Sequence, residues 1–200
     1  RAAGGEALAN GASVTDFAAV EAMVQQAIDA WGRVDILVNN AGILRDKSFA
    51  KMDMADFRLV VDVHLMGAAN CCKAVWPHMV AQDYGRIVMT TSSTGLYGNF
   101  GQSNYSAAKL ALVGLMQTLA IEGAKHGIRV NSLAPTAATR LTEGLMPEAV
   151  LAMNTLWNSR SMSRITTGRA PAITLACTNV KPPSQAKSIL PALRADTAAP

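Results

Sequence analysis

The 200-residue sequence predicts an α/β protein with a doubly wound parallel sheet. Three short apolar runs, at 34–39, 86–91 and 128–133, are typical of strands buried on both faces of such a sheet. Helix-length segments at 54–82 and 103–125 separate them. Because two parallel strands joined through a helix form a right-handed crossover, this alternation predicts a three-layer α/β/α arrangement.

The N-terminal elements are predicted from caps and breakers. Residues 1–10 have the composition of a helix end, and residues 7–14 favour a short strand. Thr15 or Asp16 is placed to cap the next helix, because either side chain can accept a hydrogen bond from a backbone amide of the first turn. Gly32 is expected to end that helix.

Three side chains near the middle of the chain form a candidate catalytic group. Tyr105 and Lys109 are four residues apart, so on a helix they share a face. An ammonium one turn away favours the phenolate and is expected to lower the pKa of Tyr105, which suits general acid–base catalysis. Ser92, thirteen residues before Tyr105, supplies a hydroxyl that can hold a reacting oxygen.

Four sequence motifs, in their order along the chain, resemble those of the short-chain dehydrogenase/reductase family, which has a Rossmann-like fold. The resemblance covers roughly residues 1–150 and is absent afterwards. A Tyr-x-x-x-Lys pair alone occurs by chance in many helices, whereas four ordered motifs do not. The motifs are the triad Ser92, Tyr105 and Lys109, the turn Val38-Asn39-Asn40-Ala41-Gly42, the strand Gly85-Arg86-Ile87-Val88, and the segment Ile128-Arg129-Val130-Asn131-Ser132-Leu133-Ala134-Pro135.

The resemblance implies a role for each of the catalytic candidates. Tyr105 exchanges the proton, Ser92 orients the substrate oxygen, and Lys109 lowers the pKa of the tyrosine and binds the nicotinamide ribose. His64 stands where many members have an asparagine that bends a helix and anchors a water of the proton relay. For His64 both a relay role and a structural role in the same helix distortion remain open.

The implied cofactor is NAD or NADP, and the sequence does not select between them. The family begins with a strand and a glycine-rich turn that binds the cofactor pyrophosphate, and no such turn precedes Arg1. The chain is therefore expected to be truncated at its N-terminus. The residues that match cofactor-binding positions of the family are Ser13, Val14, Asn40, Ala41, Gly42, Tyr105, Lys109 and Pro135.

Further segments resemble the (3R)-hydroxyacyl-CoA dehydrogenase branch of the family, found in multifunctional β-oxidation enzymes and in bacterial single-domain relatives. They are 63–67, 74–79 and 96–102. The implied small-molecule substrate is a 3-hydroxyacyl or 3-oxoacyl thioester, with a steroid or other hydrophobic alcohol or ketone as the alternative. Helices around 57–80 and 103–123 resemble the family's subunit interface, which implies a homodimer or homotetramer for the intact protein.

Composition excludes several other classes of function. The net charge is +4, but residues 1–153 hold 12 Lys/Arg and 13 Asp/Glu, so the basic excess lies in residues 154–200 and predicts no nucleic-acid partner. The three cysteines form no CxxC pair and favour a reducing, cytoplasmic location. No metal-ligating cluster is evident, and no apolar run suggests a membrane span.

The chain is predicted to divide into a partial dehydrogenase domain, 1–153, and an atypical basic tail, 154–200. The tail has five prolines, and its composition predicts a poorly ordered segment with one strand near 172–178. It is either a foreign or out-of-frame continuation or a divergent C-terminus. The alternative to an active oxidoreductase is a non-catalytic fragment of one.

Overall fold

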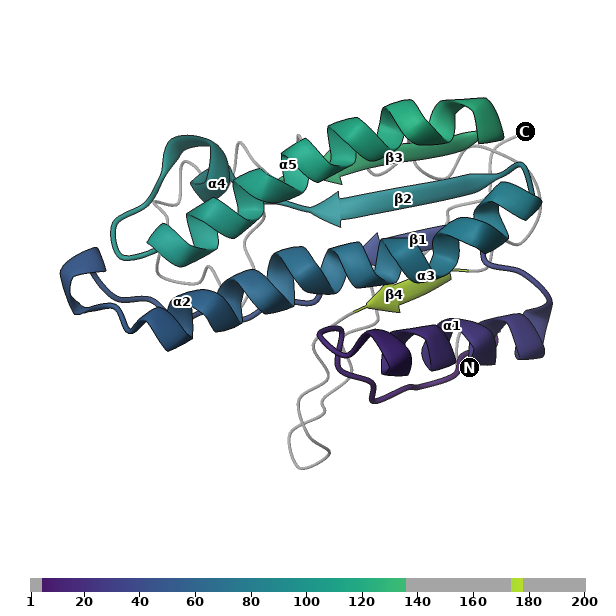
Figure 1. Ribbon diagram of the computed structural model, residues 1–200, viewed down its shortest axis with the longest axis horizontal. Helices are drawn as coiled ribbons and strands as arrows, with labels where there is room; N and C mark the ends of the chain where they lie inside the picture. Colours follow the sequence, from purple (N-terminus) through teal and green to yellow (C-terminus); the bar gives the residue numbers. More distant parts are fainter. Residues whose placement is uncertain (1–4, 136–173, 178–200) are drawn as a thin grey trace, which may run out of the picture.

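The computed structural model describes residues 5–135 together with the backbone of strand 174–177. Its sheet has four parallel strands in the order β3-β2-β1-β4, which confirms the predicted parallel α/β architecture (Figure 1). The strands are β1 (Ile36–Asn39), β2 (Gly85–Thr90), β3 (Ile128–Leu133) and β4 (Thr174–Cys177).

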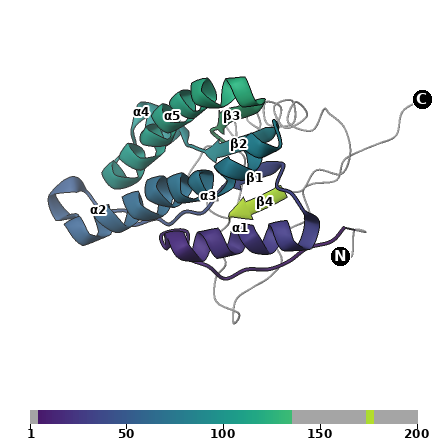
Figure 2. The ribbon, with the colours of Figure 1, turned by 45° about the vertical axis from the view of Figure 1, so that its right-hand side comes forward.

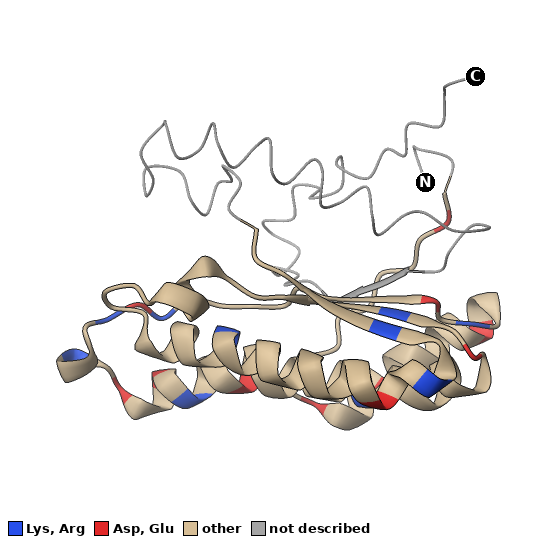
Figure 3. Ribbon diagram, turned by 90° about the horizontal axis from the view of Figure 1, so that it is seen from above, with Lys and Arg blue, Asp and Glu red and all other residues tan. Residues whose placement is uncertain are grey.

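The described helices cover one face of the sheet, as Figure 3 shows from above. In Figure 2, α3 and α5 run side by side along the sheet, and α1 lies next to β4. The second helical layer of the predicted sandwich would lie outside the described residues. The helical elements are α1 (Phe17–Trp31), η1 (Phe49–Lys51), α2 (Met54–Val61), η2 (Asp62–Met66), α3 (Gly67–Ala81), α4 (Ser93–Tyr97), α5 (Ser103–Gly123) and η3 (Ala124–His126).

Helix α1 begins and ends as its caps predict. The side chain of Asp16 accepts a hydrogen bond from the backbone amide of Ala19 at 3.1 Å. Gly32 ends the helix in a left-handed conformation with φ 76°, and its amide donates to the carbonyl of Ile28. Both caps use backbone groups that a helix end leaves without intrahelical partners, so short-range sequence signals were sufficient here.

The core lies between this helical layer and the sheet. Its largest fully buried side chains come from strands β1, β2 and β3 and from helices α3 and α5, so the strand–helix alternation is also the packing pattern. They include Leu37, Met79, Ile87, Met89, Leu112 and Ile128.

The long helix predicted over 54–82 is divided by a π-helical turn, η2, at Asp62–Met66. Two contacts at this turn involve distant parts of the chain. The ring of His64 lies against the backbone of Ile43, and Gly67 packs so closely on Val14 that an added Cβ would lie 2.5 Å from a methyl carbon. π-Turns of this kind often occur at functional sites.

The strand predicted over 7–14 is wrong. Residues 5–13 form irregular, largely exposed backbone, and the amide of Ala12 donates instead to the side chain of Asn10 at 2.8 Å. An asparagine side chain that bonds nearby backbone offers an alternative to a strand ladder. In the tail, β4 lies within the predicted strand 172–178, and the other predictions for 154–200 fall outside the described residues.

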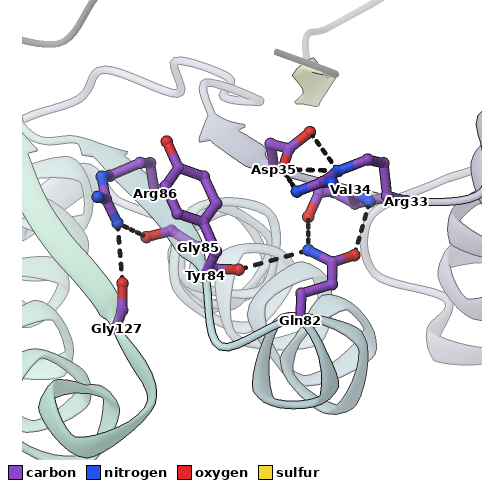
Figure 4. Close-up of polar contacts among 8 residues, drawn as sticks. All are labelled: Arg33, Val34, Asp35, Gln82, Tyr84, Gly85, Arg86 and Gly127. Carbon is purple, nitrogen blue, oxygen red and sulfur yellow. Dashed lines mark hydrogen bonds and ion pairs between the residues drawn. The ribbon is translucent and has the colours of Figure 1, made fainter. Parts of the chain in front are cut away.

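A polar network ties the amino-terminal edge of the sheet together (Figure 4). Arg33 and Asp35 form an ion pair at 2.5 Å, and the side-chain amide of Gln82 both donates to and accepts from the backbone of Val34, at 2.9 and 3.2 Å. The guanidinium of Arg86 donates at 2.8 Å to the carbonyl of the residue before β3. These contacts hold the strand ends opposite to the candidate site.

Helix α5 is more apolar than the sequence analysis, which found no run suggesting a membrane span, had indicated. Together with η3, residues 103–126 are long and apolar enough to cross a bilayer by length and composition alone. A core helix passes the same test, and α5 packs on β3 and α2 while burying the polar side chains of Asn104 and Lys109. Leu110 and Ile121 remain 50% and 80% exposed on its other side.

Candidate active site

The candidate site lies at the carboxyl edge of the sheet, where ligands bind in doubly wound folds. Ser92 lies two residues beyond β2 and caps α4, with its hydroxyl accepting a hydrogen bond from the amide of Thr94 at 3.2 Å. Tyr105 and Lys109 lie in the first turns of α5, on one face of the helix. The three residues therefore come together as their spacing predicts, although their catalytic roles remain predictions.

Lys109 is held by the end of β2. Its side chain is buried, with the residue 4% exposed, and the Nζ atom donates to the carbonyl of Thr90 at 2.5 Å. The same atom lies 5.4 Å from the centroid of the Tyr105 ring. Burial lowers the pKa of Lys109 to about 8, because an apolar environment disfavours the charged ammonium.

The pKa of Tyr105 is raised, contrary to the expectation from the Tyr–Lys spacing. Burial of the phenol is the main cause, since it disfavours the phenolate, and the nearby carboxylate of Asp46 acts in the same direction. Contact with the hydroxyl of Ser92 lowers it in part. At neutral pH the phenol is therefore protonated and able to donate a proton.

His64 is buried in the π-turn η2 and faces two parts of the site. Its Nε2 atom lies 3.0 Å from the amide nitrogen and 2.8 Å from the carbonyl oxygen of Ile43, and its ring packs edge-on against that of Tyr105 at 5.2 Å. Burial, reinforced by the charge of Lys109, lowers the pKa of His64 to about 4, although its hydrogen bond with Ile43 opposes this. The imidazole is therefore neutral at physiological pH.

The turn after β1 is shaped around this imidazole. A Cβ on Gly42 would lie 2.3 Å from the Cε1 atom of His64, so only glycine leaves room for the ring. Ala41 is half-buried and Asn40 exposed. The turn predicted to bind the cofactor thus contacts the candidate catalytic group through His64.

The remaining cofactor-binding candidates lie around the same edge. Val14 is half-buried, and its carbonyl accepts a hydrogen bond from the side chain of Asn70 at 2.9 Å. Ser13 beside it is exposed, as is Pro135, two residues beyond β3. Val14, Ala41, His64 and Lys109 line a small cavity of about 10 Å³. The structure therefore brings Val14 and Ala41 to the candidate catalytic group, whereas Ser13, Asn40 and Pro135 are exposed and do not line this cavity.

Several polar residues of the site were not identified from the sequence. Asn104 is fully buried, donates to the carbonyl of Arg45 at 3.1 Å and accepts from the amide of Tyr105 at 2.7 Å. Asn39 also lines the cavity, and its Oδ1 atom has no hydrogen-bond partner in the described part of the chain. Thr91 donates to the carbonyl of Lys109. The sequence signal that could have identified them is their position next to Tyr105, Asn40 and Ser92 in the chain.

Comparison with known proteins places this arrangement in a family. A sequence model of the short chain dehydrogenases matches residues 1–148. The chain belongs to the short-chain dehydrogenase family. The family resemblance that the motifs predicted is thereby confirmed.

Curated relatives of this dehydrogenase include larger proteins. The peroxisomal multifunctional enzyme type 2 of Drosophila melanogaster is 56% identical over 148 residues, which are 74% of this chain and 24% of that protein. The peroxisomal hydratase-dehydrogenase-epimerase of Saccharomyces cerevisiae is 56% identical over 149 residues, 74% of this chain and 16% of that protein. The chain thus spans about a quarter of these relatives or less.

A smaller relative and two solved structures extend the comparison. The 3-oxoacyl-[acyl-carrier-protein] reductase of a Synechocystis species is 44% identical over 149 residues, 74% of this chain and 60% of that protein. An NAD+-bound xylitol dehydrogenase superposes with a TM-score of 0.63 at 32% identity, covering 65% of this chain and 51% of the other. A gluconate 5-dehydrogenase from Burkholderia cenocepacia, in complex with NADP and tartrate, gives 0.64 at 31% identity, with 70% and 55% covered.

Proposed function

We propose that this dehydrogenase transfers a hydride between a nicotinamide cofactor and a 3-hydroxyacyl or 3-oxoacyl thioester. The observation that carries the proposal is the convergence of Ser92, Tyr105 and Lys109 at the carboxyl end of β2. The name of the 3-oxoacyl-[acyl-carrier-protein] reductase relative supports a 3-oxoacyl thioester as substrate. The titles of the two solved structures, one with NAD+ and one with NADP, support a nicotinamide without selecting between the two.

The residues at the inner part of the site fit the ribose end of such a cofactor. The ammonium of Lys109 and the phenol of Tyr105 supply two donors on one helix face. Beside them, the small side chain of Ala41 lines the same cavity and lets a ligand approach the backbone. We propose that Lys109 and Ala41 hold the nicotinamide ribose, and that Ser13, Val14, Asn40, Gly42 and Pro135 border the rest of the cofactor. When bound, the nicotinamide supplies the hydride chemistry.

The protein's own residues would handle the proton. In the reductive direction, the carbonyl carbon gains a hydride and the carbonyl oxygen gains the proton of Tyr105, while the hydroxyl of Ser92 orients that oxygen. The raised pKa of Tyr105 keeps this proton on the phenol at neutral pH. The ammonium of Lys109 then stabilises the phenolate that remains.

The test is a Tyr105→Phe substitution, with Tyr97→Phe as the matched control because Tyr97, at the end of α4, is 86% exposed. Activity is followed by nicotinamide absorbance during reduction of a 3-oxoacyl thioester. Loss of the proton donor should lower kcat by about 10²- to 10⁴-fold, while the control retains activity. A Tyr105→Phe enzyme with parental kcat would contradict the proposal.

Two further expectations accompany this function. We propose a homodimer or homotetramer, supported by the exposed apolar side chains of Leu59, Leu110 and Ile121 on α2 and α5. Sedimentation would test it, and a strictly monomeric protein would oppose it. The cytoplasmic location remains a prediction, which fractionation of the source cells would test.

A further inference from the structure

The end of β2 and the first turns of α5 are joined at three consecutive residues. The carbonyl of Thr90 accepts a hydrogen bond from the ammonium of Lys109 at 2.5 Å. The hydroxyl of Thr91 donates a hydrogen bond to the backbone carbonyl of Lys109 at 2.6 Å. The hydroxyl of Ser92 interacts with the phenol of Tyr105. Each residue of the run 90–92 therefore contacts one of the two helix residues of the proposed catalytic group.

The hydroxyl of Thr91 makes an unusual contact for a strand-end side chain. Thr91 is 4% exposed, and its own amide donates to the carbonyl of Leu133 at 2.8 Å, which fixes it to β3. From this position it reaches a carbonyl inside α5, a group that an ordinary helix already satisfies by its internal ladder. A valine would fill the same space equally well, so packing alone does not require the hydroxyl.

The segment after Thr91 is pressed against the same turn of α5. A Cβ on Gly95 would lie 2.9 Å from both the amide nitrogen of Leu110 and the Cβ of Lys109, so α4 and α5 touch backbone to backbone here. A close contact of this kind sets the distance between the two segments, but it does not prevent them from sliding along each other. A hydrogen bond does so, because it is directional. The hydroxyl of Thr91 supplies a directional bond at this point.

We propose that Thr91 is a positioning residue. Its hydroxyl fixes the turn of α5 that carries Lys109 against the end of β2, so that the ammonium of Lys109 and the hydroxyl of Ser92 keep one register relative to Tyr105. This inference rests on the proposed function of the triad. Thr91 acts through Lys109 and touches neither substrate nor cofactor.

The test compares Thr91→Val, which removes only the hydroxyl, with Thr91→Ser, which keeps it. Because a misplacement of about 1 Å can cost about 100-fold in rate, we expect Thr91→Val to lower kcat about 10- to 100-fold with KM changed by less than about threefold. Thr91→Ser should restore most of kcat. Thr118→Val, an exposed threonine of α5, serves as the matched control and should behave as the parent.

The pH profile separates positioning from a merely structural role. An ammonium that is displaced from Tyr105 stabilises the phenolate less, so the pKa of the phenol rises. In the alcohol-oxidising direction, the rise of kcat/KM with pH should therefore move up by about one pH unit in Thr91→Val and return in Thr91→Ser. If the role of Thr91 were only structural, Thr91→Val would lower the melting temperature without shifting the rise of kcat/KM with pH.

The outcomes distinguish this inference from the proposed function. Parental kcat and an unshifted pH limb in Thr91→Val, at equal folded fraction, would overturn the positioning role while leaving the triad intact. Full activity in Tyr105→Phe would instead overturn the proposed function. If Thr91→Val does not fold, Thr91→Ala lacks the same hydroxyl and is measured against Thr91→Ser in its place.

Discussion

Acidification should destabilise this protein through His64. The buried imidazole has a pKa lowered from 6.5 to about 4, mainly by desolvation and secondarily by the charge of Lys109. The unfolded chain therefore binds a proton at His64 between pH 6.5 and 4, whereas the folded chain does not. A lowered pKa in the folded state means that this contribution to stability is fully present above pH 6.5 and is lost as the pH falls towards 4.

The size of the effect follows from the two pKa values. The difference between 6.5 and about 4 corresponds to about 3 kcal/mol, since each pKa unit is worth about 1.4 kcal/mol. This is a large part of the ~5–15 kcal/mol by which domains are stable. The cost arises because a protonated ring, 3% exposed, would sit beside the ammonium of Lys109.

The assay is the free energy of urea unfolding at pH 7, 5.5 and 4.5, compared with a His64→Gln variant. A glutamine amide can both donate to and accept from the backbone of Ile43, which the single Nε2 atom of His64 cannot do at once. The variant has no titrating group at this position. Between pH 7 and 4.5 its free energy of unfolding should therefore decrease by about 2–3 kcal/mol less than that of the parent protein. Parallel pH dependences in the two proteins would refute the reasoning.

Two further substitutions test the packing and the caps. Gly95→Ala should lower stability by about 1–3 kcal/mol, because its Cβ would lie 2.9 Å from the Cβ of Lys109, whereas Gly114→Ala in open space on α5 should raise it by about 0.5–1 kcal/mol. Thermal unfolding measures both, and equal shifts would contradict the contact. Asp16→Ala should cost about 1 kcal/mol by removing the acceptor for the amide of Ala19, and Asp16→Asn should retain most of the stability.

Short-range signals predicted the elements whose ends depend on neighbouring residues. The cap at Asp16, the terminator at Gly32 and the strand Ile128–Leu133 appear where the sequence indicated. Periodicity did not predict the π-turn at Asp62–Met66, where only the family resemblance had indicated a helix distortion near His64. The turn is accompanied by contacts with residues far away in sequence, such as Val14 beside Gly67. Periodicity within one helix carries no information about such contacts.

The candidate site shows the same division. The spacing of Tyr105 and Lys109 predicted a shared helix face, and the structure has it. The spacing did not reveal that the ammonium would bond the carbonyl of Thr90, an acceptor supplied by a different element. Burial then raises the pKa of the phenol, an effect that depends on the whole surrounding fold and not on the local sequence.

The geometry of the proposed proton donor is set by contacts within the protein itself. The ammonium of Lys109 donates a hydrogen bond to the carbonyl of Thr90, and the backbone amide of Tyr105 donates to the side-chain oxygen of Asn104. Both acceptors are neutral polar groups at buried or half-buried positions, where salt screens little. In contrast, Ser13 and Asn40, predicted to border the cofactor, are exposed. The residues that would tune the proton transfer are therefore structurally separate from these exposed residues at the border of the predicted cofactor site, whereas Lys109 would serve both the proton transfer and the binding of the cofactor.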